Sequence, residues 1–265
     1  MKGIALHSII PVRTEAREGA EQGTQILFGE TFEIIDHDSE ITNPKWTYVR
    51  LDSDGQEGWV DTKMVTPMAD KEYRAYKKAC RTAATVVFPM AYAVSENNGQ
   101  TIPLTAGTRL ANYADGRFEL LGVGFRIEPG MVITTPLTLN EQTLLQTVRF
   151  FLNVPYLWGG KNALGMDCSG FTQTVLSLFG KQLLRNASEQ ATQGRTIADL
   201  SKAKAGDLAF FDHADGRISH VGIIIDPQRI IHCSGRVKVE KLDSNGIYNN
   251  EQGGYSHHLV RIQRV

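Results

Sequence analysis

Short alternating apolar and polar runs, separated by turn residues, dominate the amino-terminal half of the chain. Residues 24–35 predict two short strands, and residues 46–51 alternate apolar and polar side chains. Asp54 and Gly55 then give a strong signal for a hairpin turn. Closely spaced hairpins of this kind predict a small β-barrel over residues 1–70.

A second β-rich stretch follows, after a segment at residues 71–82 that is expected to form a helical turn. Turn-forming residues at 97–99, 114–117 and 128–130 divide this stretch into short strands. They predict a second SH3-like β module over residues 83–136, although the same strands could instead extend the first barrel.

Helical periodicity is clearest beyond residue 138. Residues 140–153 carry apolar side chains on one face. Asn140 or Thr138 would cap this helix. Residues 171–179 repeat the helical spacing, so Cys168 falls at the entrance of a second helix.

Two apolar runs, at residues 218–225 and 229–233, are typical of consecutive buried strands. The residues between them, 226–228, suit a hairpin turn. Adjacent antiparallel strands would bring His220 in the first run close to His232 in the second.

The composition is that of a globular protein of two or three domains: 265 residues, of which 42% are hydrophobic and 22% are charged. A net charge of −1 and a pI near 6.7 argue against nucleic-acid binding and against adsorption to anionic membranes. No segment reaches the roughly 18 consecutive apolar residues of a membrane helix. Residues 1–11 lack the features of a signal peptide, so we expect a cytoplasmic protein, or a periplasmic or cell-envelope one if a leader was removed.

Cys168, His220 and His232 supply the parts of a cysteine hydrolase. The start of a helix favours a thiolate, which also needs a base that a third group orients. Backbone N–H groups at the same helix start could hold the oxyanion of an acyl-transfer intermediate. Each residue is more often structural when taken singly, but the combination predicts a catalytic site.

The same residues, with Cys233, are also potential zinc ligands. The chain has no CxxC pair and no close histidine pair with the usual ligand spacing, so we expect neither a metal site nor another cofactor. Three cysteines give no sensible disulfide framework, so Cys80 and Cys233 are expected to be unpaired thiols.

Several blocks of sequence, in order along the last part of the chain, resemble the NlpC/P60 family of cell-wall peptidases. The blocks are Tyr156-Leu157-Trp158-Gly159-Gly160, Gly165-Met166-Asp167-Cys168-Ser169-Gly170-Phe171, Ala205-Gly206-Asp207-Leu208-Ala209-Phe210-Phe211, His220-Val221-Gly222-Ile223 and His232-Cys233-Ser234-Gly235. The resemblance implies an α+β protein whose papain-like catalytic domain, residues 138–265, cleaves murein stem peptides.

The resemblance also assigns roles at the predicted site. Cys168 is the nucleophile, His220 the general base and His232 the group that orients the base. Tyr156 matches a tyrosine that lines the family's active site near the oxyanion position, although a core aromatic beside a Gly-Gly turn is an equally good interpretation.

The first barrel resembles a bacterial SH3 domain through Gly58-Trp59-Val60. One or two such barrels ahead of the catalytic domain are similar to YkfC-type γ-D-glutamyl-L-diamino acid endopeptidases, whose leading module closes one end of the cleft. The resemblance implies that Glu21 binds the substrate ammonium, although a solvated loop glutamate is the alternative. Gln56 stands where related enzymes have a partner tyrosine, for which Tyr48 could compensate.

Four more residues match family positions on the catalytic side. The resemblance implies that Asp167, Ser169 and Ser188 contact the substrate, and Asp167 is also a natural helix N-cap. Arg185 could pair with a carboxylate, but it is more often a surface charge.

These observations predict a cysteine endopeptidase that cleaves the γ-D-glutamyl–diamino acid bond of murein peptides with a free N-terminal L-Ala. We expect the enzyme to be a monomer and to act on soluble peptides during peptidoglycan recycling. One alternative is a wall hydrolase or amidase that acts on intact peptidoglycan. A non-catalytic SH3-type binding protein is the other, but the three filled catalytic positions count against it.

Overall fold

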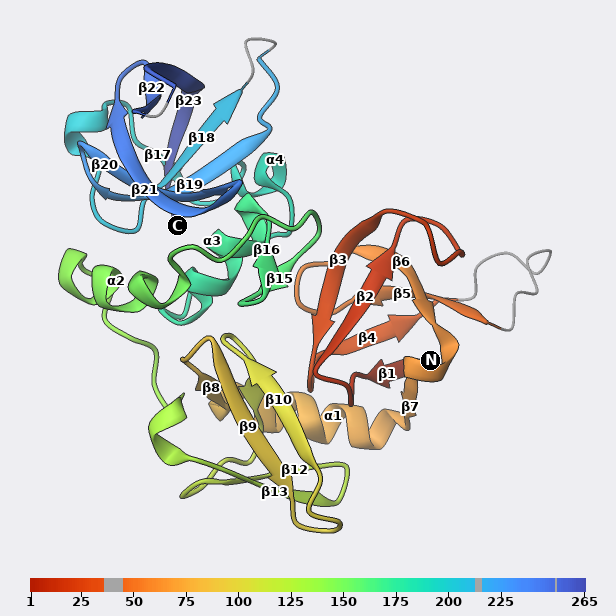
Figure 1. Ribbon diagram of the computed structural model, residues 1–265. Coiled ribbons are helices and arrows are strands. Elements are labelled where there is room, and N and C mark those ends of the chain that lie inside the picture. The colour runs from red at the N-terminus through yellow and green to blue at the C-terminus, as the bar shows by residue number, and fades with distance from the viewer. Residues whose placement is uncertain (36–44, 213–215, 251) are drawn as a thin grey trace. The chain divides into compact units, whose positions relative to one another are not determined.

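The computed structural model describes residues 1–35, 45–212, 216–250 and 252–265. The chain forms two compact units, Met1–Thr135 and Pro136–Val265. Figure 1 labels their elements. No helix within the described ranges is long and apolar enough to cross a membrane.

The first unit opens with a seven-stranded antiparallel sheet in the order β3-β2-β6-β5-β4-β1-β7. Its elements are β1 (Lys2–Ile4), β2 (Ile9–Arg13), β3 (Gln22–Leu27), β4 (Thr31–Ile34), β5 (Trp46–Leu51), β6 (Glu57–Asp61), the 3₁₀ helix η1 (Thr62–Met64) and β7 (Thr66–Met68). The sheet encloses a core of small and branched side chains around Phe32. These strands confirm the β-rich structure expected in this part of the chain and the predicted hairpin at Asp54 and Gly55.

A helix and a second β-rich part complete the first unit. They comprise α1 (Asp70–Ala79), η2 (Cys80–Thr82), β8 (Ala84–Val86), β9 (Met90–Ser95), β10 (Thr101–Thr105), β11 (Arg109–Leu110), β12 (Arg117–Leu120), β13 (Val123–Ile127), η3 (Pro129–Met131) and β14 (Val132–Ile133). The strands form two sheets of their own, in the orders β10-β9-β13-β12 and β11-β8-β14, rather than continuing the sheet of the first barrel.

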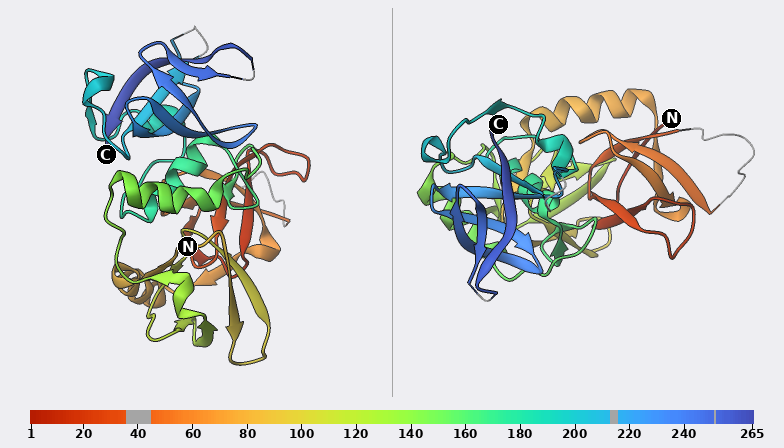
Figure 2. Two further views of the ribbon diagram at one scale, coloured as in Figure 1. Left: turned by 60° about the vertical axis from the view of Figure 1, so that its left-hand side comes forward. Right: turned by 90° about the horizontal axis from the view of Figure 1, so that it is seen from above.

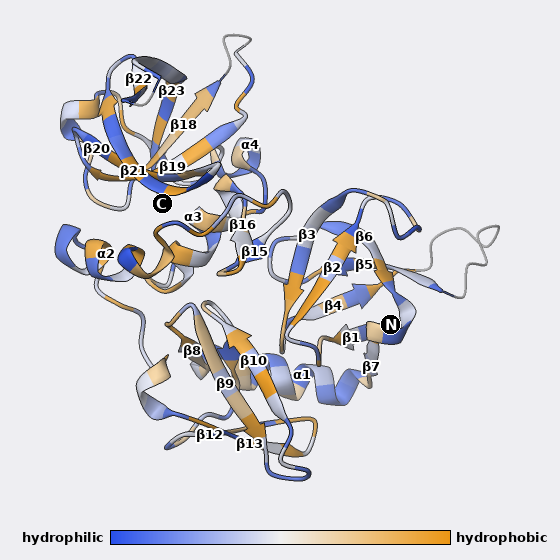
Figure 3. Cartoon of the chain, viewed as in Figure 1, coloured by the Kyte–Doolittle hydropathy of each residue, from blue (hydrophilic) through white to orange (hydrophobic). Residues whose placement is uncertain are grey.

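One hydrophobic core joins the two parts of the first unit. Ile4 and Phe28 from the first barrel pack with Phe118 and Phe125 from the second part. The helix α1 is hydrophilic along most of its length (Figure 3) and buries Tyr76, whose hydroxyl donates to the carbonyl of Gly29 at 2.8 Å. The helix thus ties the second part of the unit to the first.

The second unit combines helices with a closed barrel. Its elements are α2 (Glu141–Val148), η4 (Arg149–Phe151), β15 (Lys161–Asn162), β16 (Gly165–Met166), α3 (Cys168–Ser177), α4 (Ala187–Gln190), β17 (Arg195–Thr196), η5 (Leu200–Lys202), β18 (Leu208–Asp212), β19 (His220–Asp226), β20 (Arg229–Ser234), β21 (Arg236–Asp243), β22 (Gly246–Asn249) and β23 (Gly254–Arg264). The strands run β23-β18-β19-β20-β21-β22, and β22 pairs back onto β23 to close the barrel.

The helices of the second unit pack on one flank of this barrel. Figures 1 and 2 show α2 and α3 on the same side of the strands, and both helices contact β19. Asn140, one of the two predicted caps, accepts from the backbone N–H of Thr143 at 3.0 Å and so caps α2. Helices on a mostly antiparallel barrel confirm the predicted α+β fold.

Candidate active site

The start of α3 places Cys168 beside a tight backbone turn. Asp167 is the N-cap, and its Oδ1 accepts from the N–H of Gly170 at 2.7 Å. A Cβ at Gly170 would lie only 2.1 Å from the carbonyl oxygen of Gly160, so only glycine lets the Gly-Gly turn pack against the helix start. The predicted position of Cys168 at a helix entrance is confirmed.

The two histidines come from neighbouring strands, as the sequence predicts. β19 and β20 are antiparallel, with Gly222 opposite His232. Nε2 of His220 lies 2.8 Å from Nδ1 of His232. Both rings are buried, and His232 is completely shielded from solvent.

The thiol of Cys168 faces the beginning of β19. The backbone N–H groups of Val221 and Ser169 lie close enough to the Cys168 sulfur to lower the pKa of its thiol. Val221 directly follows His220, so the structure brings the three predicted residues into one place: Cys168 at the start of α3, His220 at the start of β19 and His232 on β20. Their catalytic roles remain predictions.

The resting charge of Cys168 differs from the sequence-based expectation of a thiolate. Burial, followed by the negative charge of Asp167, raises the pKa of the Cys168 thiol to about 11. The N–H groups of Val221 and Ser169 and the charge of Arg185 lower the pKa but do not offset the burial. At neutral pH Cys168 is therefore a thiol, and its proton must leave during attack.

Tyr156 lies half-buried in the segment that leads to β15. Its N–H donates to the carbonyl of Gly235 at 2.9 Å. Burial, and then the negative charge that Cys168 carries once ionised, raise the pKa of the Tyr156 hydroxyl, which therefore stays protonated. A protonated hydroxyl within electrostatic range of the sulfur suits the predicted oxyanion role, which remains a prediction.

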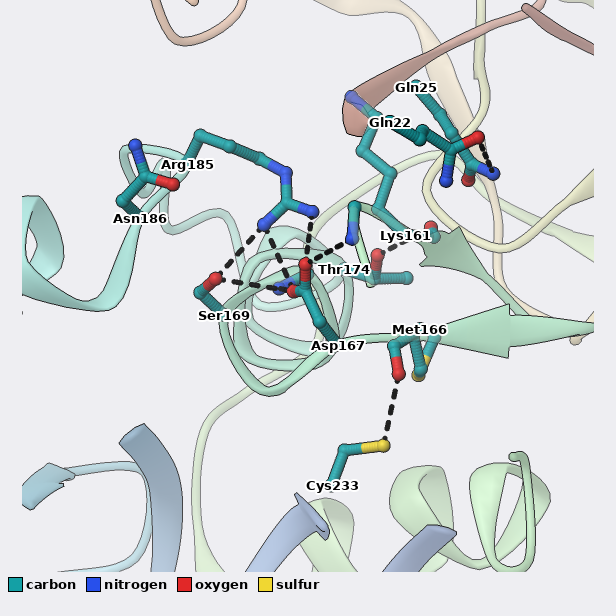
Figure 4. Close-up of polar contacts among 12 residues, drawn as sticks. Gln22, Gln25, Lys161, Met166, Asp167, Ser169, Thr174, Arg185, Asn186 and Cys233 are labelled. Atoms are coloured by element: carbon teal, nitrogen blue, oxygen red, sulfur yellow. Dashed lines mark hydrogen bonds and ion pairs between the residues drawn. The ribbon is translucent and has the colours of Figure 1, made fainter. Parts of the chain in front are cut away.

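Arg185 is not the surface charge that its sequence context favours: its side chain is 1% exposed. It donates to both carboxylate oxygens of Asp167, at 3.0 and 2.6 Å, and to Oγ of Ser169 at 2.9 Å (Figure 4). Asp167 also accepts from the N–H of Gly159 at 2.9 Å. The ion pair therefore fixes the residues on both sides of Cys168, because buried charges persist only when they are paired.

The other predicted substrate residues are more exposed. Ser188 is exposed on α4 of the second unit, and Glu21 is exposed just before β3 of the first. Tyr48 donates to Glu57 at 3.1 Å and packs edge-on against Trp59. Substrate contacts remain a prediction for all four residues: Glu21, Ser188, Asp167 and Ser169.

Two further residues next to the histidines were not found from the sequence. Oε2 of Glu240 on β21 lies 2.8 Å from Nε2 of His232. The ring of His257 on β23 packs on His220 with ring centroids 4.2 Å apart. Alternation along residues 236–243 could have placed Glu240 on the same side as Lys238, but nothing local marks His257.

The three cysteines are all free, and Cys233 donates its S–H to the carbonyl of Met166 at 3.1 Å (Figure 4). Within the described ranges, no group of three or more His, Cys, Asp and Glu side chains could hold a metal ion.

Comparisons with known proteins agree with this geometry. Residues 153–256 match the NlpC/P60 family, and residues 12–64 match the bacterial dipeptidyl-peptidase Sh3 domain. A Bacillus subtilis (strain 168) protein named gamma-D-glutamyl-L-lysine dipeptidyl-peptidase is 31% identical over 226 residues, which cover 79% of this chain and 71% of the relative. A Bacillus cereus protein of the same name is 26% identical over 264 residues, covering 89% of this chain and 75% of the relative.

The fold has a close match among solved structures. The crystal structure of an NlpC/P60 family protein from Bacillus cereus ATCC 10987 matches with a TM-score of 0.80 and 20% identity, covering 100% of this chain and 99% of the other. An NlpC/P60 endopeptidase from Photobacterium damselae matches with a TM-score of 0.71 and 16% identity, over 98% of this chain and 70% of the other. With a cysteine at a helix start, paired histidines on adjacent strands and a leading SH3 domain, the chain belongs to the NlpC/P60 family of cysteine peptidases.

Proposed function

We propose that this protein is a cysteine endopeptidase that hydrolyses the bond between γ-D-glutamate and the diamino acid of murein peptides. The supporting observation is the match, over 79% of this chain, to the Bacillus subtilis protein named gamma-D-glutamyl-L-lysine dipeptidyl-peptidase. The arrangement of Cys168, His220 and His232 supports the reaction type. We further propose that the substrate is a free peptide with an N-terminal L-Ala, so that the protein acts in peptide recycling in the cytoplasm.

In the proposed reaction, the thiol proton of Cys168 moves to Nδ1 of His220 as the sulfur attacks the γ-carbonyl carbon of D-Glu. The C–N bond then breaks, and His220 passes the proton to the departing amine of the diamino acid. Water attacks the resulting thioester while His220 takes a proton from the water. The S–C bond then breaks to release the peptide acid, and His220 returns the proton to the sulfur.

Charge on the carbonyl oxygen must be stabilised during both attacks. The backbone N–H groups of Ser169 on α3 and Val221 on β19 lie near the Cys168 sulfur, and the hydroxyl of Tyr156 remains protonated. We propose that these donors form the oxyanion site. Donors placed in a water-poor site typically contribute a factor of about 10² to 10³ in kcat.

We propose that Glu21 binds the ammonium of the N-terminal L-Ala. The Glu21 side chain is exposed, and its carboxylate makes no hydrogen bond or ion pair with any residue that the structure describes. Removing one partner of a desolvated ion pair costs several kcal/mol. Acetylating the substrate amine should therefore lower kcat/KM by more than about a hundredfold.

A direct test compares three substrates. The protein is incubated with free L-Ala-γ-D-Glu-diamino acid peptides, with their N-acetylated forms and with intact sacculi, and the products are identified by mass spectrometry. The proposal requires cleavage of the free peptide at the γ-D-Glu bond. Equal cleavage of the acetylated peptide or of sacculi would instead favour a wall hydrolase, and no cleavage of any substrate would favour a binding protein.

Glu21→Gln isolates the ammonium contact. We expect this variant to raise KM for the free peptide and to narrow the preference over the acetylated one. Glu119→Gln is the matched control, because Glu119 is an exposed carboxylate on β12 of the same unit. Identical KM values for the two variants would contradict ammonium binding by Glu21. They would leave the proposed cysteine endopeptidase reaction unaffected.

A further inference from the structure

A carboxylate extends the histidine pair into a buried chain of hydrogen-bonding groups. In the β20–β21 register, Lys238 lies opposite His232, and Glu240 lies opposite Ile230. Oε2 of Glu240 is 2.8 Å from Nε2 of His232, whose Nδ1 is 2.8 Å from Nε2 of His220. The Glu240 side chain is only 10% exposed and that of His232 is fully buried, so water has little access to the contact between them.

The chemistry of these groups fixes where each proton sits. An ionised carboxylate can only accept, so the proton between Glu240 and His232 belongs to Nε2 of His232. A neutral imidazole protonated at Nε2 has an accepting Nδ1. That atom must then receive a hydrogen from Nε2 of His220. The second nitrogen of His220, Nδ1, is therefore left unprotonated and able to act as a base.

We propose that Glu240 is a positioning residue that sets the tautomers of both histidines and thereby exposes Nδ1 of His220 as the general base. This inference rests on the proposed function, because it names how that reaction obtains its base. Without an acceptor at Glu240, His232 can place its proton on Nδ1. Its Nδ1 would then no longer accept from His220.

Lys238 makes the arrangement compatible with a neutral His232. Its Nζ lies 3.1 Å from the same Glu240 oxygen that faces His232. Burial lowers the pKa of His232; Glu240 opposes this shift and Lys238 reinforces it. Burial by itself would raise the pKa of Glu240, but its contacts with His232 and Lys238 hold that pKa below its usual value. The carboxylate therefore stays ionised while His232 stays neutral, as the tautomer assignment requires.

His257 is a further titratable group beside the chain, in addition to the Cys168 thiol. His257 packs on His220, with its Nδ1 2.8 Å from Oγ of Ser256. It is also within ring contact of His232, with centroids 5.8 Å apart. A cationic His232 would carry hydrogens on both nitrogens and would repel the imidazolium that His220 becomes in the reaction. Burial and the charge of Lys238 disfavour that cationic state, because both lower the pKa of His232.

The test is nitrogen NMR of the free protein labelled in its histidine rings. The signals are assigned with His220→Asn and His232→Asn, since the chain has 7 histidines. The proposal requires the Nε2–H tautomer at both His220 and His232 near neutral pH. An Nδ1–H tautomer at His232, or a doubly protonated ring, would overturn it. The measurement needs no substrate, so it stands or falls separately from the proposed activity.

Variants of Glu240 provide the second measurement. Glu240→Gln keeps an acceptor oxygen, so the tautomers and at least about a third of kcat should remain. Glu240→Leu removes the acceptor, so the Nε2–H signal of His232 should be lost and kcat should fall by about tenfold or more with little change in KM. Glu141→Leu is the control, because Glu141 is an exposed carboxylate paired with Arg229. Equal loss of kcat in Glu240→Gln and Glu240→Leu, with tautomers unchanged in both, would overturn the positioning role.

Discussion

Gly222 lies directly opposite His232 across β19 and β20, and a Cβ added to Gly222 would sit 2.8 Å from the Cβ of His232. The same added atom would lie 2.7 Å from Cδ1 of Ile230. The absence of a side chain at Gly222 therefore allows the backbone of β20 to approach closely enough for His232 to reach His220. The glycine in the His220-Val221-Gly222 block thus has a geometric role.

Gly222→Ala should damage activity through His232 rather than through Cys168. Overpacking a buried site typically costs about 1–3 kcal/mol, so we expect that loss in the free energy of unfolding, measured with urea. Displacement of His232 should also lower kcat more than tenfold. Gly254→Ala is the control, because a Cβ at Gly254 would meet no atom within 4 Å. Full activity in Gly222→Ala would show that the close approach is unnecessary.

Cys168→Ala should abolish hydrolysis and leave the fold intact. The sulfur is the nucleophile that attacks the peptide carbonyl in the proposed reaction, so kcat should drop at least about a thousandfold, while circular dichroism and the melting temperature change little. Cys80→Ser, in the first unit, should keep its activity. Substantial turnover by Cys168→Ala would refute the thiol mechanism.

The rate of alkylation of Cys168 should rise steeply with pH. The thiolate reacts and the thiol does not, and burial raises the pKa of Cys168 to about 11. The fraction of thiolate therefore grows about tenfold for each pH unit below that value. Iodoacetamide labelling, quantified at Cys168 by mass spectrometry between pH 6 and 10, should show this slope. A plateau below pH 7 would instead reveal a resting thiolate–imidazolium pair.

The sequence predicts those parts of the site that depend on local pattern. The helical spacing after Cys168 and the two apolar runs around His220 and His232 lie within single elements, so their positions follow from periodicity. The burial of Arg185 could not be predicted, because it depends on a contact with Asp167 eighteen residues away along the chain. The contact between Glu240 and His232 likewise depends on the β20–β21 register, which no short-range signal fixes.

His220 and His232 should respond differently to the same substitution. His220→Asn removes the base and should eliminate turnover. In the native protein, Nε2 of His220 lies 2.8 Å from Nδ1 of His232. The amide oxygen of Asn in His232→Asn can still accept a hydrogen bond from this Nε2–H, so partial activity should remain. Single-turnover kinetics on the free peptide measure both. Equal and complete loss would contradict the separate roles.

His232 should also make the protein less stable in acid. Burial lowers the pKa of His232 from 6.5 in the folded state. Above pH 6.5 the ring of His232 is neutral in both the folded and the unfolded protein. Below pH 6.5 the ring gains a proton in the unfolded chain but not in the folded one, so the free energy of unfolding decreases as the pH falls. The urea midpoint should therefore decrease below about pH 6.5, and His232→Asn should make this decrease shallower. An unchanged pH profile in His232→Asn would assign the acid sensitivity to other groups.

The buried Arg185–Asp167 pair should be the most sensitive point for the stability of the catalytic unit. Arg185→Met leaves the Asp167 carboxylate, whose side chain is 10% exposed, without its cation. Removing one partner of a buried pair typically costs about 3–5 kcal/mol. The exposed pairs that Arg229 makes with Glu141 and Asp226 should each be worth less than about 1 kcal/mol. Arg229→Met is therefore the matched control.

Hydrogen exchange in peptides from Pro136–Val265 separates this unit from the first one. We expect Arg185→Met to speed hydrogen exchange throughout α3 and to lower activity, because Asp167, the N-cap of α3, loses its ion pair with Arg185. Adding Asp167→Asn to Arg185→Met should recover part of the lost stability, since the uncompensated charge is gone while the amide oxygen can still cap Gly170. Recovery of stability without recovery of activity would mean that the charge of Asp167 is itself needed for the reaction. If Arg185→Met and Arg229→Met behave alike, the buried pair does not anchor the helix that carries Cys168.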